Sequence, residues 1–232
     1  MKNKSILIVL TSHPTLGNTG KETGFHYEEM TTPYLAFAEA GYGITLASIM
    51  GGEPPHDPGS LEDKLDDNPE SVIAFLKDER AKNALRDTLP VSKLSSDDYC
   101  AIYLPGGHGT MWDFPENVDL NRLVSECYQA GKPTAAICHG LAGFIGAKKA
   151  DGSALVSGKK INCFTDAEEK EIGLQDTVPF LLESALKELG AKFECSANFQ
   201  AHVATDDNLI TGQNPASAGG VAKAVIAYLK DH

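Results

Sequence analysis

The sequence has little positive charge and no long apolar run, and these two absences exclude several classes of protein. Its 20 lysines and arginines are outnumbered by 32 aspartates and glutamates, which gives a formal net charge of −12. Phosphate backbones and anionic lipid repel such a chain, so we expect no nucleic acid and no membrane among its partners. The apolar part of the opening "MKNKSILIVLTSHP" is too short for a secretory signal or a transmembrane helix.

Cysteine is also scarce. The five cysteines are an odd number and form no CxxC pair, which excludes a disulfide framework and favours free thiols in the cytoplasm. A chain of 232 residues buries about 70% of its surface on folding, so its core needs no metal or disulfide. Because no segment has the composition of a linker, we predict a single domain over residues 1–232.

Apolar runs of strand length recur along the chain, with helical patterns between them. Runs without charge suit strands that are buried on both faces, as in a parallel sheet with helices above and below. The pattern predicts a doubly wound α/β fold with a mostly parallel sheet and helices on both faces. The predicted strands are Ile6–Leu10, Ile44–Ala47, Ala101–Leu104, Thr134–Ile137 and Ile161–Phe164, and the predicted helices are Tyr34–Ala40, Leu120–Ala130, Val178–Leu189 and Ala216–Leu229.

Residues 51–98 depart from this alternation of strand and helix patterns. The segment is rich in Pro, Asp, Glu and Lys and holds two weakly amphipathic stretches, Ser71–Lys77 and Ala81–Leu89. It is long for a connection between a strand and a helix. We predict a small helical insertion or cap that shapes the entrance of a pocket.

Cys138 in "AAICHGLAG" is the first candidate functional residue. It lies between a strand-like run and a helix-like stretch, and its neighbours are small. A nucleophile at such a turn is forced into a strained conformation, and the N–H groups of the following helix favour its thiolate by lowering the thiol pKa. The alternative is an inert buried cysteine beside a histidine, which is common in apolar runs.

Two further stretches are candidates for the same site. "CAIYLPGGHGTMWD" ends a predicted strand in Gly106 and Gly107, and glycines there let backbone N–H groups approach a ligand, although a plain turn has the same composition. "GFHYEEM" carries Glu28 and Glu29 near a helix start. Only one of two adjacent helical residues faces the sheet, where a buried carboxyl stays protonated, and the alternative is that both complement the helix dipole.

Six stretches together resemble the ThiJ/PfpI superfamily, and within it the heat-shock chaperone and glyoxalase III subgroup. They occur in the order that is found in that superfamily, over nearly the whole chain. The resemblance implies a flavodoxin-like fold of the class I glutamine-amidotransferase type. The stretches are "LTSHP", "TGFHYEE", "YLPGGHGTMWDFP", "AAICHGLAG", "INCFTDAEE" and "LITGQNPASA".

The resemblance also implies roles for the candidate residues. Cys138 is matched to the nucleophile and the adjacent His139 to its acid/base partner. Glu29, and not Glu28, is matched to the buried glutamate that contacts the cysteine. Many relatives have proline where this chain has Leu141, which changes a pocket wall but leaves the mechanism intact.

The remaining roles come from the same matching. The acid that orients the histidine lies in "FTDAEE", where the matching favours Glu169 over Asp166 and Glu168. The backbone N–H groups of Gly107 and His139 would form the oxyanion site, and His108 would flank the pocket.

The resemblance implies a cofactor-independent glyoxalase III that converts methylglyoxal and water to D-lactate and also accepts glyoxal. The same chemistry would suit a deglycase that acts on glycated proteins. The alternatives are a holding chaperone for unfolded proteins, a cysteine peptidase or amidase, and a redox sensor. The family also implies a homodimer.

No cofactor or metal is expected. "GNTGKE" at 17–22 lacks the first glycine and the final Ser/Thr of a phosphate-binding loop. No HExxH motif is present, and scattered histidines are more often surface residues than metal ligands.

Overall fold

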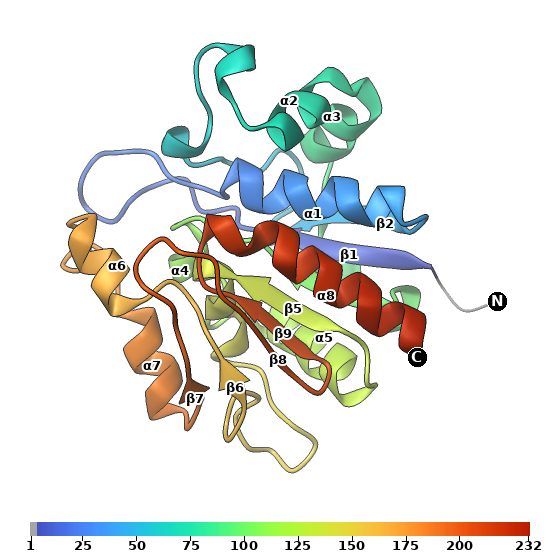
Figure 1. The fold of residues 1–232 in the computed structure, drawn as a ribbon, viewed down its shortest axis with the longest axis vertical. Helices are drawn as coiled ribbons and strands as arrows, with labels where there is room; N and C mark the ends of the chain where they lie inside the picture. Colours follow the sequence, from blue (N-terminus) through green and yellow to red (C-terminus); the bar gives the residue numbers. More distant parts are fainter. Residues whose placement is uncertain (1–3) are drawn as a thin grey trace.

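Buried apolar runs form the centre of a seven-stranded sheet in the computed structural model, which describes residues 4–232 (Figure 1). The strand order is β3-β2-β1-β4-β5-β9-β8, and all pairs are parallel except β8 with β9. The doubly wound α/β class is therefore confirmed. Four of the predicted strands are confirmed as β1 (Ser5–Leu10), β2 (Gly43–Ser48), β4 (Ala101–Leu104) and β5 (Thr134–Ile137).

The fifth predicted strand, Ile161–Phe164, is wrong in extent and in place. Only Lys160–Ile161 is extended, as β6, and it pairs with β7 (Lys192–Phe193) in a separate two-stranded sheet. The backbone N–H of Asn162 donates to the side-chain oxygen Thr211 Oγ1 at 3.1 Å instead of to a backbone carbonyl. Further along the chain, the ring of Phe164 lies against that of His139, with centroids 4.6 Å apart.

The strand beside β5 was not predicted. β9 (Leu209–Gly212) pairs with β5 in parallel and with β8 (Val203–Asp206) antiparallel. Asp207 lies in the tight turn between them at φ +55°. The stretch is short and charged at its turn, so its apolar content does not distinguish it from a loop.

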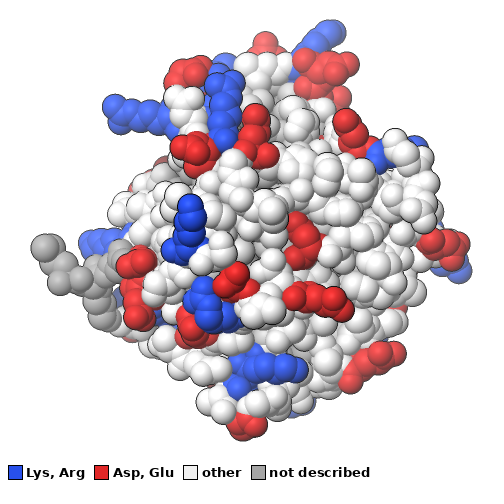
Figure 2. Space-filling model, turned by 180° about the vertical axis from the view of Figure 1, so that it is seen from behind, with Lys and Arg blue, Asp and Glu red and all other residues white. Residues whose placement is uncertain are grey.

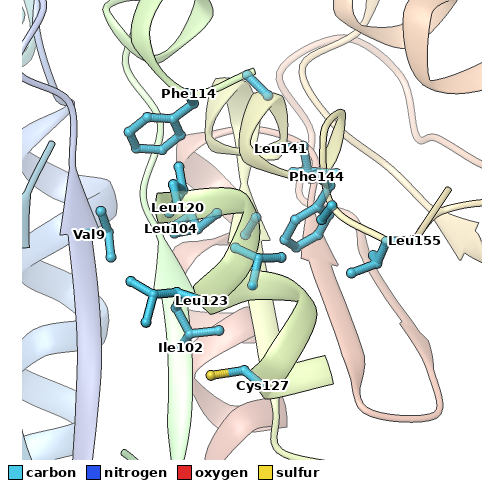
Figure 3. Packing of buried hydrophobic residues seen from close by; sticks show 14 of the residues in the cluster. Val9, Ile102, Leu104, Phe114, Leu120, Leu123, Cys127, Leu141, Phe144 and Leu155 are labelled. Carbon is cyan, nitrogen blue, oxygen red and sulfur yellow. The ribbon is translucent and has the colours of Figure 1, made fainter. Parts of the chain in front are cut away.

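Helices cover both faces of the sheet. α1 (Tyr27–Glu39) and α8 (Ala218–Asp231) pack against each other on one face, and α5 (Val118–Gln129) packs on the other. β1 alternates between the two cores, because Ile6 and Ile8 face α1 while Leu7 and Val9 lie in the core that Figure 3 shows around α5. The smaller helices are α4 (Thr110–Asp113), α6 (Asp166–Glu171) and α7 (Leu182–Glu188), the last shorter than predicted.

Residues 51–98 contain the two predicted helices and also an edge strand. α2 (Glu70–Lys77) and α3 (Glu79–Arg86) lie outside α1, and α2 contacts it (Figure 1). β3 (Leu89–Pro90) then pairs with β2, which ties the segment to the sheet. The rest of the segment is made of short 3-10 turns.

Charges of both signs are interspersed on the face shown in Figure 2, where the drawn residues form no continuous basic surface. Among residues 4–232, no helix has the length and apolar character needed to cross a bilayer.

Candidate active site

The candidate residues meet at the carboxyl ends of β4 and β5. The strand order reverses between β1 and β4, and ligands of doubly wound folds bind outside the carboxyl ends of the strands at such a point. Gly106 and Gly107 follow β4, and Cys138 follows β5 directly. The fold therefore brings two distant loops to one place.

Cys138 lies on a strained turn. Its φ of +56° is in the left-handed region, which a residue with a β-carbon rarely adopts. The turn leads into a 3-10 helix over Cys138–Phe144. A β-carbon on Gly140 would lie 2.3 Å from the carbonyl oxygen of Leu104, so only glycine lets the turn pack against β4. The sulfur end of the turn lines a cavity.

His139 lies between the sulfur and a carboxylate. Its Nδ1 is 3.3 Å from Cys138 Sγ, and its Nε2 is 2.7 Å from Glu169 Oε2. Of the three acids considered in "FTDAEE", Glu169 is the one that contacts the imidazole. Asp166 accepts a hydrogen bond from Ser184, and Glu168 forms the capping box of α6.

Glu169 is ionised, and this fixes the tautomer of His139. Burial would raise the pKa of Glu169, but hydrogen bonds from His108 and His139 outweigh burial and lower it to about 2. Burial and the charge of His108 lower the pKa of His139, against the effect of Glu169. A neutral imidazole that donates its Nε2–H to Glu169 presents an unprotonated Nδ1 to the sulfur.

Glu29 is fully buried in the first turn of α1, whereas Glu28 is only half-buried. Burial raises the pKa of Glu29 to about 8, against hydrogen bonds from Cys138 and from the Gly106 N–H. The Gly106 N–H donates to Oε2 at 2.7 Å. The other oxygen, Oε1, makes no hydrogen bond to a nitrogen or oxygen atom among residues 4–232. At neutral pH the carboxyl of Glu29 is therefore protonated.

The predicted low pKa of the Cys138 thiol is wrong for this resting arrangement. Burial raises the pKa well above its usual value, and the Glu29 carboxyl raises it further, while the backbone N–H of His139 acts in the opposite direction. Cys138 is 4% exposed, and the following helix is a single short 3-10 segment. Desolvation of the thiolate therefore exceeds the stabilisation by aligned N–H groups.

Both glycines after β4 are required by close packing. A β-carbon on Gly106 would lie 2.7 Å from Glu29 Oε2, and one on Gly107 would lie 2.2 Å from the carbonyl oxygen of Gly24. Gly107 also has φ +101°. It lines the cavity with Cys138, and no acceptor among residues 4–232 pairs with its N–H.

Two histidines belong to the site in ways that the sequence did not reveal. His108 was expected only to flank the pocket, but its Nε2 is 2.9 Å from Glu169 Oε1 and its ring centroid is 4.0 Å from that of His139. His26 also lines the cavity, and its Nδ1 is buried without a partner among residues 4–232. Burial lowers the pKa of His26 to about 4, against Asp57. The residues that interact here, His108 with Glu169 and His26 with Asp57, lie far apart in the sequence.

His108, His139 and Glu169 also form a set that could hold a metal ion, because one ligand atom from each lies within 4.8 Å of the others. No sequence motif indicates this set, because Glu169 is 30 residues beyond the second histidine. Here both imidazoles contact the carboxylate directly, which suits a hydrogen-bonded triad as well as a metal.

The cavity above these groups has a volume of about 750 Å³. Residues 57–59, in the segment for which an insertion is predicted, line one part of it. The remaining lining residues are Leu16, Lys21, Glu22, His26, Gly107, His108, Cys138, His139, Phe164, Ile172, Leu174, Phe199 and Pro215.

Known proteins share this arrangement of elements. A glutathione-independent glyoxalase of Saccharomyces cerevisiae, HSP31, is 31% identical, and the match covers 100% of both chains. The crystal structure of glyoxalase III from Candida albicans superposes with a TM-score of 0.89 at 31% identity, covering 98% of each chain. The Rapid Encystment Protein 24 KDa of Francisella tularensis reaches a TM-score of 0.92 at 38% identity, covering 97% of this chain and 99% of that one.

The family model for DJ-1/PfpI proteins matches residues 21–228. This span includes the glutamate of α1, the glycine pair after β4, the cysteine on its turn and the acid of α6. The chain belongs to the DJ-1/PfpI family.

Proposed function

We propose that the chain is a glyoxalase III, which converts methylglyoxal and water to D-lactate without glutathione or another cofactor. One observation carries the proposal: a thiol, a neutral imidazole with an ionised partner, and a protonated carboxyl meet at the end of one cavity. These are the groups that thiol addition and proton transfer between two carbons require. Similarity to glutathione-independent glyoxalases supports it.

The first step is addition of the sulfur to the aldehyde carbon. Because burial raises the pKa of Cys138, the thiol gives its proton to His139 Nδ1 as the S–C bond forms, and no free thiolate is needed beforehand. Glu169 stabilises the resulting imidazolium. The aldehyde oxygen becomes an alkoxide, which the backbone N–H groups of Gly107 and His139 stabilise.

The second step moves hydrogen between the two substrate carbons. A base removes the proton from the former aldehyde carbon, which gives an enediol, and a proton is then delivered to the neighbouring carbon. His139 and Glu29 are the two candidates for these transfers. Glu29 first gives its proton to the alkoxide, and the resulting carboxylate can then remove the proton from the former aldehyde carbon and deliver it to the neighbouring one, which favours Glu29 as the group that carries it between the carbons.

The third step releases the product. The rearranged intermediate is a thioester of a 2-hydroxy acid, and water adds to its carbonyl carbon while the S–C bond breaks. The sulfur recovers a proton and the acid leaves. One carbon is oxidised and its neighbour is reduced by the same amount, so the reaction consumes one water and needs no external oxidant.

The same chemistry would serve a deglycase that reverses early dicarbonyl adducts on proteins. Removal of free methylglyoxal also removes such adducts by mass action, which makes the two activities easy to confuse. Release of purified adduct in the presence of an aldehyde trap separates them: a deglycase continues to act, and a glyoxalase alone does not.

The test is formation of D-lactate from methylglyoxal by protein treated with EDTA, without glutathione. We expect turnover by the wild type and loss of at least about 10³-fold in kcat for Cys138→Ser, since the nucleophile is removed. Cys195→Ser is the matched control, because Cys195 is exposed and lies outside the cavity. Full activity of the Cys138→Ser variant would refute the mechanism.

The homodimer implied by the family and a cytoplasmic location remain predictions. Sedimentation equilibrium of the purified protein tests the first, and fractionation of the source cells tests the second.

A further inference from the structure

The cavity is much larger than methylglyoxal requires. At about 750 Å³ it falls within the range of roughly 300–1,000 Å³ that buries ligands of drug size. Methylglyoxal has only three carbons, so bound at Cys138 it leaves most of this space to water. The shape of the remaining cavity therefore bears on which dicarbonyl compounds bind best.

The cavity lining combines apolar and charged side chains. We call the apolar group the apolar wall, made of Leu16, Phe164, Ile172, Leu174, Phe199 and Pro215. The rest of the lining holds Cys138 and the histidines of the site together with the charged side chains of Lys21, Glu22 and Asp57. Ile172 and Phe199 are each 41% exposed, although large apolar side chains are generally buried. Exposed apolar groups that line the cavity of the nucleophile suit the binding of an apolar ligand group.

The backbone of Phe199 is held in place by the buried carboxylate of Glu168. It has φ +60°, a costly conformation for a bulky residue. Its backbone N–H donates to Glu168 Oε1 at 2.8 Å, and the side-chain amide of Asn214 donates to the same oxygen at 2.8 Å. Glu168 is fully buried and contacts neither Cys138 nor His139. The structure thus fixes an exposed aromatic ring in a strained position.

The apolar wall reaches the reacting groups through Phe164. Its ring centroid is 4.6 Å from that of His139 and 6.3 Å from that of Phe199. An apolar group attached to the second carbonyl carbon of a substrate bound at Cys138 would therefore have aromatic surface beside it, continuing to the exposed end of the cavity. An anionic group would instead share the cavity with two acidic side chains, Glu22 and Asp57, and one basic side chain, Lys21.

We propose that the preferred substrates are 2-oxoaldehydes with an aryl or branched-alkyl group on the ketone carbon, which packs against the apolar wall. This inference rests on the proposed glyoxalase function and specifies its substrate class. The reaction is unchanged: R–CO–CHO and water give R–CHOH–COOH, through the same thioester at Cys138. For R = phenyl the product is mandelate.

The test compares kcat/KM for phenylglyoxal and methylglyoxal, measured as mandelate and lactate formed. We expect the wild type to prefer phenylglyoxal by about 10–100-fold, in line with the discrimination that apolar pockets reach. Phe199→Asn should lower this preference at least about fivefold, with a larger loss in kcat/KM for phenylglyoxal than for methylglyoxal, since asparagine tolerates positive φ and removes only the apolar ring.

Two further variants complete the design. Ile172→Ala should lower the preference in the same direction, which keeps the test available if Phe199→Asn folds poorly. Val118→Asn is the control, because Val118 is 80% exposed and lies at the start of α5, outside the cavity. It should leave the preference unchanged.

The outcomes separate the two proposals. Turnover of methylglyoxal by the wild type without a preference for phenylglyoxal, or an equal loss on both substrates in Phe199→Asn, would overturn the substrate class and leave the glyoxalase function standing. No turnover of either substrate by the wild type would overturn the glyoxalase function and this inference together.

Discussion

Glu29 and Glu169 are buried carboxyl groups beside the same cysteine and histidine, yet they are held in opposite protonation states. The pKa of Glu29 is raised to about 8, and that of Glu169 is lowered to about 2. Burial acts in the same direction on both. The difference lies in their partners: Glu169 accepts hydrogen bonds from two imidazoles, and Glu29 accepts one backbone N–H and faces a thiol.

The comparison shows how one site supplies both an acid and an anion at neutral pH. Hydrogen-bond donors offset the desolvation of a carboxylate, and where they are few the carboxyl stays protonated. Glu169 is therefore suited to orient and stabilise an imidazolium, and Glu29 to donate a proton. Glu29→Gln and Glu169→Gln each remove one of these two ionisable groups.

Glu29→Gln should have the largest effect. We expect kcat for methylglyoxal to fall by about 10²–10⁴-fold, the usual contribution of a positioned proton donor. The free energy of unfolding should rise instead, most of all at alkaline pH. Because the folded pKa of Glu29 is raised from 4.5 to about 8, its stabilising contribution is complete below pH 4.5 and is lost as pH rises through 8.

The glutamine variant does not ionise, so it should exceed the wild type in unfolding free energy by on the order of 1–3 kcal/mol at pH 8, and by less at pH 5. Thermal unfolding at both pH values measures this. Glu28→Gln is the matched control, one position earlier and only half-buried, and should change neither property much. A glutamine variant less stable at pH 8 than at pH 5, relative to wild type, would contradict a protonated Glu29.

Glu169→Gln should lower kcat by roughly 10²-fold, because a neutral amide stabilises an imidazolium poorly and permits the wrong tautomer. The effect of Glu169→Gln on the free energy of unfolding should be opposite in sign to that of Glu29→Gln. The pKa of Glu169 is lowered from 4.5 to about 2, so its stabilising contribution is present above pH 4.5 and is lost as pH falls through 2.

The Glu169→Gln variant should therefore be less stable than wild type at pH 7, by on the order of 1–3 kcal/mol, and the gap should narrow in acid. Urea unfolding at pH 7 and at pH 3 measures the gap. Glu171→Gln, on the exposed side of the same helix, is the control. If the gap stays constant with pH, Glu169 is not held as an anion.

The residues that touch the sulfur could be found from sequence, because they follow buried strands or begin a helix. Cys138 comes directly after the apolar run that forms β5, and Gly106 and Gly107 follow the run that forms β4 after one proline. Helical geometry shows that only one of two adjacent acids faces inward, and the family resemblance identifies it as Glu29. These are local signals, and parallel strands bring their carboxyl ends together without further information.

The sequence could not give the pairings that depend on tertiary packing. His108 and Glu169 are 61 residues apart, and nothing in either motif indicates that they share a hydrogen bond. The thiol pKa was predicted in the wrong direction because the helix dipole is a local feature, whereas burial depends on the whole core. The left-handed conformation of Phe199 likewise depends on Glu168, a residue in another segment.

His108→Gln should have the smallest effect and separates the two imidazoles that share Glu169. Glutamine keeps an N–H donor for the carboxylate but cannot carry a positive charge. The charge of His108 lowers the pKa of His139, so its removal should raise that pKa. The acidic limb of the pH profile of kcat/KM should then move to higher pH by less than about one unit, with kcat at pH 8 within about threefold of wild type. His13→Gln, whose ring stacks on Trp112 outside the cavity, is the control and should leave the limb in place. A limb that moved to lower pH would show that His108 supports the protonated form of His139 instead of opposing it.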